Sequence, residues 1–126
     1  MQLLRRVPGN YRSFIYCTAI RNGGVKEWEF ASIQYDKSQQ ANEKQNLQLG
    51  MSCTKQQWLI SRYLNDQLNP AKVRLQDAQT GISRMGLTSY GNLITWNFIK
   101  ENWDFLDSKL IFLKTCIFVV IIQINF

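Results

Sequence analysis

The amino-acid sequence predicts an all-α fold, and three observations carry that prediction. Apolar residues recur at helical spacing along most of the chain, as at Trp28, Ala31 and Tyr35. Proline occurs only twice in 126 residues, at Pro8 and Pro70, so helical stretches meet few interruptions. The breaks between the periodic stretches are short, which indicates antiparallel helical hairpins.

The first hairpin is predicted around Gly23 and Gly24. Residues 1–10 form a lead-in, and a first helix is expected over about 11–21, with helical spacing at Tyr11, Phe14, Ile15, Thr18 and Ala19. We expect the two glycines to end this helix in the left-handed cap conformation, which glycine adopts without steric cost. A second helix, over about 25–36, has an apolar face made of Trp28, Ala31, Ser32 and Tyr35.

The second hairpin is predicted from two shorter periodic stretches. A third helix over about 40–54 contains two pairs spaced by four residues, Leu47 with Met51 and Leu49 with Cys53. A fourth helix over about 55–66 is expected to bury Ile60, Tyr63 and Leu64.

The third hairpin follows Pro70. Its first helix carries the apolar series Leu75, Ala78, Ile82 and Met85. Gly81 and Gly86 weaken this helix, and we expect them to permit close packing. The break at 90–92 precedes a sixth helix that continues to about Leu106, with an apolar face of Trp96, Ile99, Trp103 and Leu106.

Three hairpins of this size favour a HEAT-like α-solenoid over an irregular helical bundle. Trp28, Trp58 and Trp96 follow each other at intervals of 30 and 38 residues, too unevenly for a strict repeat. Degenerate helical repeats bury their faces only by stacking on neighbours. The expected architecture is therefore about three stacked hairpins over 11–106, followed by a hydrophobic tail over 107–126.

Composition excludes several classes of site. The net charge is +6, but the 15 basic residues are scattered, so we expect a solvated basic surface and no nucleic-acid partner. The chain contains no histidine, which excludes His-based acid–base catalysis and the H-E-x-x-H zinc motif. Cys17, Cys53 and Cys116 lack the paired short spacing of a zinc site. No catalytic, cofactor-binding or metal-binding residue is expected in this chain.

Several motifs in order carry a family resemblance. They are Tyr16-Cys17-x-x-Ile20-Arg21-x-Gly23-Gly24, Glu27-Trp28-x-Phe30, Glu43-Lys44, Cys53-Thr54-Lys55, Trp58-Leu59-x-x-Arg62-Tyr63-Leu64, Asn69-Pro70-x-x-Val73-Arg74-x-Gln76-Asp77-Ala78, and Gly91 with Trp96, Phe98, Asn102-Trp103 and Leu106. Together they resemble the C-terminal helical domain of aminopeptidase N-type zinc aminopeptidases. The resemblance runs from about Val7 to Leu106, with departures at Met51-Ser52 and Leu75.

The resemblance implies a fragment of an α-solenoid domain that packs over the catalytic module of a zinc exopeptidase. In that family the zinc and the catalytic residues belong to other domains, so this chain alone is expected to be inactive. Its implied partner is the catalytic module, and contact with the peptide substrate would be indirect. Arg21 and Arg74 match basic family positions, where a cavity-facing role and a surface or interhelical salt bridge are both open.

The resemblance also pairs Cys17 with Cys53, which align with cysteines that are bonded in many secreted members. Two buried free thiols are the alternative. A disulfide would place the domain in an oxidising compartment, on the extracellular face of the plasma membrane or in the secretory pathway.

The resemblance ends after Leu106. In residues 110–126, 13 of 17 side chains are apolar. A segment of this length is at the short limit for a membrane span. A tail anchor, a core helix or strand, and a truncated or mis-spliced gene model are the three interpretations, and we favour the last. The alternative function is a non-catalytic helical interaction scaffold, with or without a membrane anchor in residues 110–126.

Overall fold

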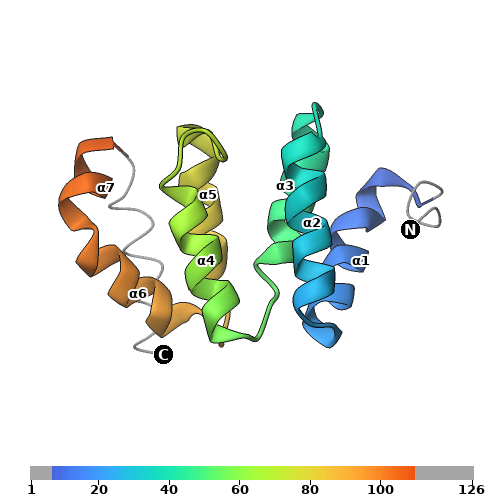
Figure 1. Ribbon diagram of the computed structural model, residues 1–126, viewed down its shortest axis with the longest axis horizontal. Coiled ribbons are helices and arrows are strands. Elements are labelled where there is room, and N and C mark those ends of the chain that lie inside the picture. Colours follow the sequence, from blue (N-terminus) through green and yellow to red (C-terminus); the bar gives the residue numbers. More distant parts are fainter. Residues whose placement is uncertain (1–6, 110–126) are drawn as a thin grey trace. The chain divides into compact units, whose positions relative to one another are not determined.

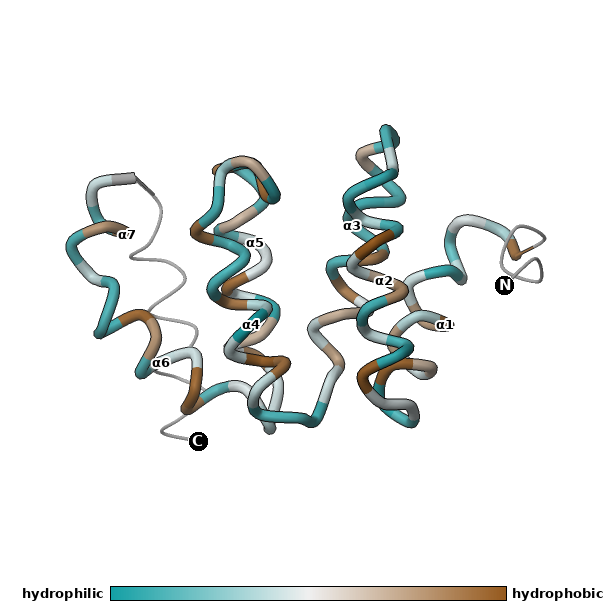
Figure 2. Tube along the Cα trace, in the orientation of Figure 1, coloured by the Kyte–Doolittle hydropathy of each residue, from teal (hydrophilic) through white to brown (hydrophobic). Residues whose placement is uncertain are grey.

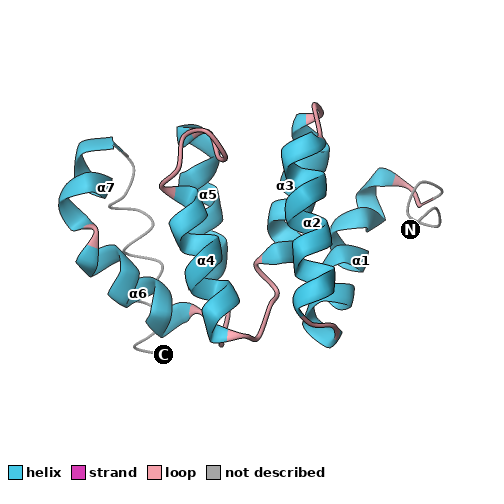
Figure 3. Cartoon of the chain, in the orientation of Figure 1, coloured by secondary structure: helices cyan, strands magenta, loops and turns pink. Residues whose placement is uncertain are grey.

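The computed structural model describes residues 7–109, and every regular element in this range is a helix. The helices are α1 (Gly9–Asn22), α2 (Val25–Lys37), α3 (Ala41–Met51), α4 (Gln57–Gln67), α5 (Leu75–Gly86), α6 (Asn92–Glu101) and α7 (Trp103–Lys109) (Figure 1). Short loops connect them (Figure 3). The all-α prediction is therefore confirmed for the described residues. The chain divides into two compact units, Met1–Thr54 and Lys55–Phe126, which are described separately below.

Unit 1 contains α1, α2 and α3, and α2 presents to its core the face that was predicted. Trp28, Ala31, Ser32 and Tyr35 are all buried, and the Trp28 side chain is fully enclosed. Hydrophilic and hydrophobic stretches alternate along these helices (Figure 2). The single apolar stripe of α2 leaves only one face that can turn inward, which explains why periodicity located it.

The buried face of α1 differs from the predicted series. Tyr16 and Ile20 are buried, whereas Phe14 is 71% exposed and Tyr11 is 58% exposed. The α1 sequence has apolar residues on several sides, so periodicity alone could not select the inward side. Packing against α3 makes that selection.

The prediction that Gly23 and Gly24 adopt a left-handed conformation is wrong. Gly23 has φ −97° and Gly24 has φ −132°. Space explains Gly23 instead, because a Cβ atom there would lie 2.6 Å from Glu27 Cδ and 2.7 Å from Ala19 O. The Gly24 N–H donates a 2.7 Å hydrogen bond to Glu27 Oε2, and this bond lowers the pKa of the Glu27 carboxyl. Glu27 thereby satisfies a free N–H group at the start of α2.

Unit 2 contains α4 to α7, and its core is mainly aliphatic. Ile60, Tyr63 and Leu64 on α4 are buried as predicted. On α5 the predicted series is confirmed at Ala78, Ile82 and Met85, but Leu75 is 48% exposed at the first position of the helix. The Tyr63 hydroxyl donates a 2.9 Å hydrogen bond to Gly81 O, which joins α4 to a glycine of α5.

The predicted sixth helix is two helices. Asn102 lies between α6 and α7 with φ −112° and ψ 22°, and both its backbone N–H and its side-chain amide donate to Phe98 O. Ile99 and Leu106 are buried on either side of this break, whereas Trp103 is 39% exposed. The three tryptophans of the proposed repeat are not equivalent, since Trp28 is enclosed and Trp58 is 51% exposed.

No helix within residues 7–109 combines the length and the apolar character needed to cross a membrane. The predictions for the tail at 110–126 concern residues that lie outside the described range.

Candidate functional site

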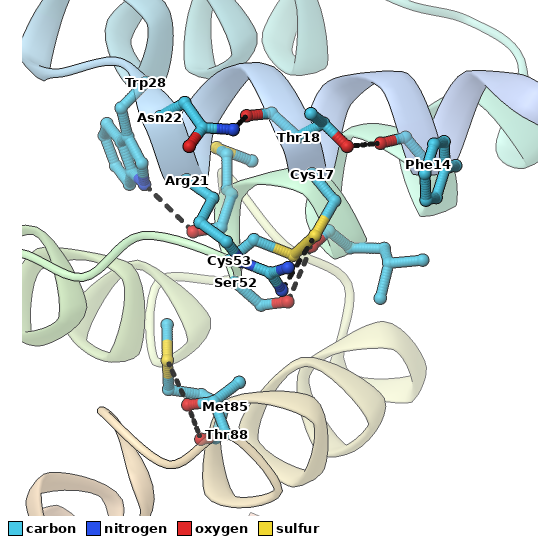
Figure 4. Close-up of a disulfide and its surroundings, with 12 residues drawn as sticks. Phe14, Cys17, Thr18, Arg21, Asn22, Trp28, Ser52, Cys53, Met85 and Thr88 are labelled. Carbon is cyan, nitrogen blue, oxygen red and sulfur yellow. Dashed lines mark hydrogen bonds between the residues drawn. A yellow bond between two sulfur atoms is a disulfide. The ribbon is translucent and has the colours of Figure 1, made fainter.

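The strongest sequence-derived site residues, Cys17 and Cys53, are joined by a disulfide in unit 1 (Figure 4). Cys17 lies on α1, and Cys53 lies in the turn after α3, because α3 ends at Met51. Their Cα atoms are 5.2 Å apart and they are separated by 36 residues in sequence. Closing a loop of this length stabilises a fold by about 4 kcal/mol in the chain-entropy account.

Close packing of α1 against α3 places the two cysteines within bonding reach. A Cβ atom on Gly50 would lie only 2.5 Å from Tyr16 Cβ, so glycine permits the helices to approach this closely. The indole N–H of Trp28 donates a buried 3.2 Å hydrogen bond to Met51 O (Figure 4). The end of α3 is therefore tied to both α1 and α2.

A polar cluster at the other end of the α1–α3 contact consists of Arg12, Tyr16 and Glu43. Arg12 Nη1 lies 3.1 Å from Glu43 Oε2, and the Tyr16 hydroxyl donates a 2.5 Å hydrogen bond to Glu43 Oε1. Burial, with the Glu43 hydrogen bond and charge adding to it, raises the pKa of the Tyr16 phenol. The phenol stays protonated and acts as a donor, so the cluster joins two helices and does not provide a general base.

The sequence did not reveal this cluster. Glu43 was noted only as a motif residue, and neither Arg12 nor Tyr16 was assigned to it. The signal that could have found it is the spacing of Arg12 and Tyr16, which puts two hydrogen-bond donors on one side of α1.

A polar groove of about 570 Å³ borders the cluster. Its lining is rich in side-chain amides and consists of Gly9, Asn10, Arg12, Gln40, Asn42, Glu43, Gln45 and Asn46. This lining contains no serine, cysteine or histidine, so it offers none of the usual nucleophile–base pairs.

The two arginines at basic family positions have local partners. Arg21 is exposed on the last turn of α1, and its Nη2 lies 3.5 Å from Cys17 Sγ (Figure 4). Arg74 precedes α5, and its Nε lies 2.8 Å from Asp77 Oδ2 in the first turn. Arg74 thus forms a surface salt bridge within unit 2, one of the two roles left open by the sequence.

The described residues do not fit a zinc site. No group of three or more His, Cys, Asp or Glu side chains in residues 7–109 gathers closely enough to hold a metal ion. The chain lacks histidine, and Cys17 and Cys53 are used in the disulfide.

The comparison with known proteins points to the same family as the sequence motifs. Residues 2–121 match the family described as ERAP1-like C-terminal domain, a range that extends beyond Leu106. The chain is 42% identical over 97 residues to aminopeptidase N of Bos taurus, covering 77% of this chain and 10% of the relative. It is 38% identical over 94 residues to aminopeptidase N of Homo sapiens, covering 75% and 10%.

A third relative is not an aminopeptidase N. Glutamyl aminopeptidase of Mus musculus is 35% identical over 104 residues, which cover 82% of this chain and 11% of that protein. The chain therefore spans about a tenth of the length of these curated relatives. Since the family match covers nearly the whole chain, the chain belongs to the ERAP1-like C-terminal domain family.

Proposed function

We propose that this chain forms part of the C-terminal helical domain of an aminopeptidase N-like zinc metallopeptidase, which removes N-terminal residues from peptides. The observation that carries the proposal is the family match over residues 2–121, together with relatives named as aminopeptidases. In this proposal the chain has a structural role, and the zinc and the catalytic residues belong to the rest of the protein. Its composition supports this division, because a chain without histidine cannot supply the H-E-x-x-H motif.

Exposed apolar side chains support packing onto further protein. On α1, Tyr11 and Phe14 are 58% and 71% exposed. Unit 2 exposes more large apolar residues, namely Trp58, Leu75, Leu87, Tyr90, Leu93, Trp103 and Phe105. Exposed apolar surface of this kind marks contact sites, and stacked helical repeats require it between neighbours. The proposal therefore includes HEAT-like stacking and contact with the catalytic module.

The disulfide supports an oxidising compartment. A bond such as Cys17–Cys53 forms readily in the secretory pathway and outside the cell, whereas the cytosol keeps most cysteines reduced. The proposed location is the secretory pathway or the extracellular face of the plasma membrane.

A segment exchange tests the proposal. In bovine aminopeptidase N, the segment that aligns with this chain is replaced by the aligned residues of this chain, and a glycine–serine linker of equal length serves as the control. The chimera is expected to hydrolyse aminoacyl-nitroanilides in a chelator-sensitive manner, whereas the linker variant and this chain alone are inactive. A folded chimera no more active than the linker variant, or chelator-sensitive activity of this chain alone, would contradict the proposal.

The membrane-held scaffold is the second candidate, and the same protein can be tested for it. Membrane fractionation with and without residues 110–126 measures whether the tail holds the chain at a membrane. Loss of membrane association on removing the tail would favour the scaffold.

A further inference from the structure

The surroundings of the two disulfide sulfur atoms differ in charge. On the Cys17 side, the exposed Arg21 guanidinium lies 3.5 Å from Sγ, with the residues spaced by one helical turn. On the Cys53 side, Sγ lies 3.4 Å from the carbonyl oxygen of Leu49. Figure 4 shows Arg21 beside the sulfur–sulfur bond. A cation faces one sulfur, and a carbonyl oxygen, which also accepts a 2.6 Å hydrogen bond from the Ser52 hydroxyl, faces the other.

This difference in charge makes Cys17 Sγ the better leaving group of the two sulfur atoms. A guanidinium stabilises a neighbouring thiolate, and the more stable thiolate leaves faster in thiol–disulfide exchange. A carbonyl oxygen favours the protonated thiol, to which it can serve as hydrogen-bond acceptor. Both cysteines are half-buried, so the bond is not sealed from solvent.

We propose that the Cys17–Cys53 bond is a redox-sensitive switch with a fixed direction, in which a soluble thiol attacks Cys53 and Cys17 departs as a thiolate beside Arg21. In the first step, RS⁻ forms a bond to Cys53 Sγ while the Cys17–Cys53 bond breaks, and the electron pair leaves on Cys17 Sγ. In the second step, another RS⁻ attacks the external sulfur of the mixed disulfide, RS–SR forms, and Cys53 leaves and takes a proton from water. Two thiols together supply the two electrons.

The structural consequence is local. Opening the bond removes the covalent tie between α1 and the turn after α3, while the Trp28–Met51 hydrogen bond still holds α2 to the end of α3. Reduction therefore loosens the contact between α1 and the turn after α3. This switch goes beyond the scaffold role and does not depend on it.

The test identifies the sulfur that receives the thiol. The full chain, carrying Cys116→Ser so that no other thiol competes, is treated with glutathione, quenched early with N-ethylmaleimide and mapped by mass spectrometry. The expected product carries glutathione on Cys53 and maleimide on Cys17. Glutathione on Cys17, or an equal mixture, overturns the proposal.

Variants of Arg21 test the cause of the direction. Arg21→Gln is expected to slow the first step by about threefold, because the Cys17 thiolate that has lost its neighbouring cation is the poorer leaving group, and to reduce the preference for Cys53. Arg21→Lys keeps the charge and should restore both. Arg74→Gln removes an exposed arginine of unit 2 and is the matched control. The role given to Arg21 is overturned if the Arg21→Gln chain unfolds at the same temperature as the parent and yet reacts at the same rate to give the same product.

Discussion

Units 1 and 2 are both helical, but they are held together by different interactions. In unit 1, α1 and α3 are joined by a disulfide, the Arg12–Glu43 ion pair and the Tyr16–Glu43 hydrogen bond. Unit 2 relies on aliphatic burial, with Ile60, Leu64, Ile82, Met85, Ile99 and Leu106 fully enclosed. The difference teaches that oxidation state and alkaline pH should act mainly on unit 1, in addition to packing, whereas packing is the main determinant of unit 2.

Opening the disulfide should produce the largest difference between the units. Cys17→Ser with Cys53→Ser is expected to destabilise unit 1 by about 4 kcal/mol, because the loop of the unfolded chain is no longer closed. Hydrogen-exchange mass spectrometry should show faster exchange in 9–54 and little change in 57–109. Equal acceleration in both ranges would contradict the comparison.

Truncation of the aliphatic core should produce the reverse pattern. Ile82 is fully buried on α5, so Ile82→Ala is expected to cost about 3 kcal/mol from lost burial and the resulting cavity. Exchange should quicken in 57–109. Ile33→Ala is the control, since Ile33 is 51% exposed on α2 and its truncation should cost less than about 0.5 kcal/mol.

The close approach of α1 and α3 can be probed at Gly50. The added methyl of Gly50→Ala meets Tyr16 Cβ, and overpacking should destabilise unit 1 by about 2 kcal/mol despite the better helix propensity of alanine. Chemical unfolding of the oxidised protein measures this. Gly9→Ala, whose Cβ would meet nothing within 4 Å, should leave stability nearly unchanged.

The polar cluster should make unit 1 sensitive to alkaline pH. Tyr16→Phe removes the donor to Glu43 and is expected to cost about 1.5 kcal/mol at neutral pH. Because the pKa of Tyr16 is raised above its ordinary value of 10.0, its contribution is fully present below pH 10 and is lost as the pH rises towards the folded-state value. The stability difference between the parent and Tyr16→Phe should shrink between about pH 10 and 12. A constant difference over that range would argue against this assignment.

In unit 2, replacing one buried polar residue should raise the stability instead of lowering it. Thr95 is fully buried on α6, and within the described part of the chain nothing hydrogen-bonds its hydroxyl. Thr95→Val keeps the shape and removes the unpaired group, so it should stabilise unit 2 by about 1 kcal/mol. Thermal unfolding checks the sign, and a lower midpoint would show that the hydroxyl has a partner in solution.

The sequence was a good guide where a helix has one apolar stripe and a poor guide where it has several. The α2 face was predicted in full, whereas on α1 the buried residues are Tyr16 and Ile20 instead of the predicted series. The break at Asn102 was missed because the apolar spacing continues from Ile99 to Leu106 across it. Local spacing carries no information about the surface a helix will meet.

By itself, the sequence determined the helical class, the approximate helix positions, the family motifs and the residues that the resemblance pairs as a disulfide. These depend on local periodicity, on glycine and proline, and on short motifs that can be read along the chain. Only the tertiary structure decided which side of α1 faces inward, why Gly50 is glycine, and that Arg12, Tyr16 and Glu43 meet. The contacts of Arg21 with Cys17 and of Leu49 O with Cys53 join residues four apart in sequence, so local spacing already brings them close. The α1–α3 contacts instead depend on how two helix surfaces pack, and not on the spacing within either helix.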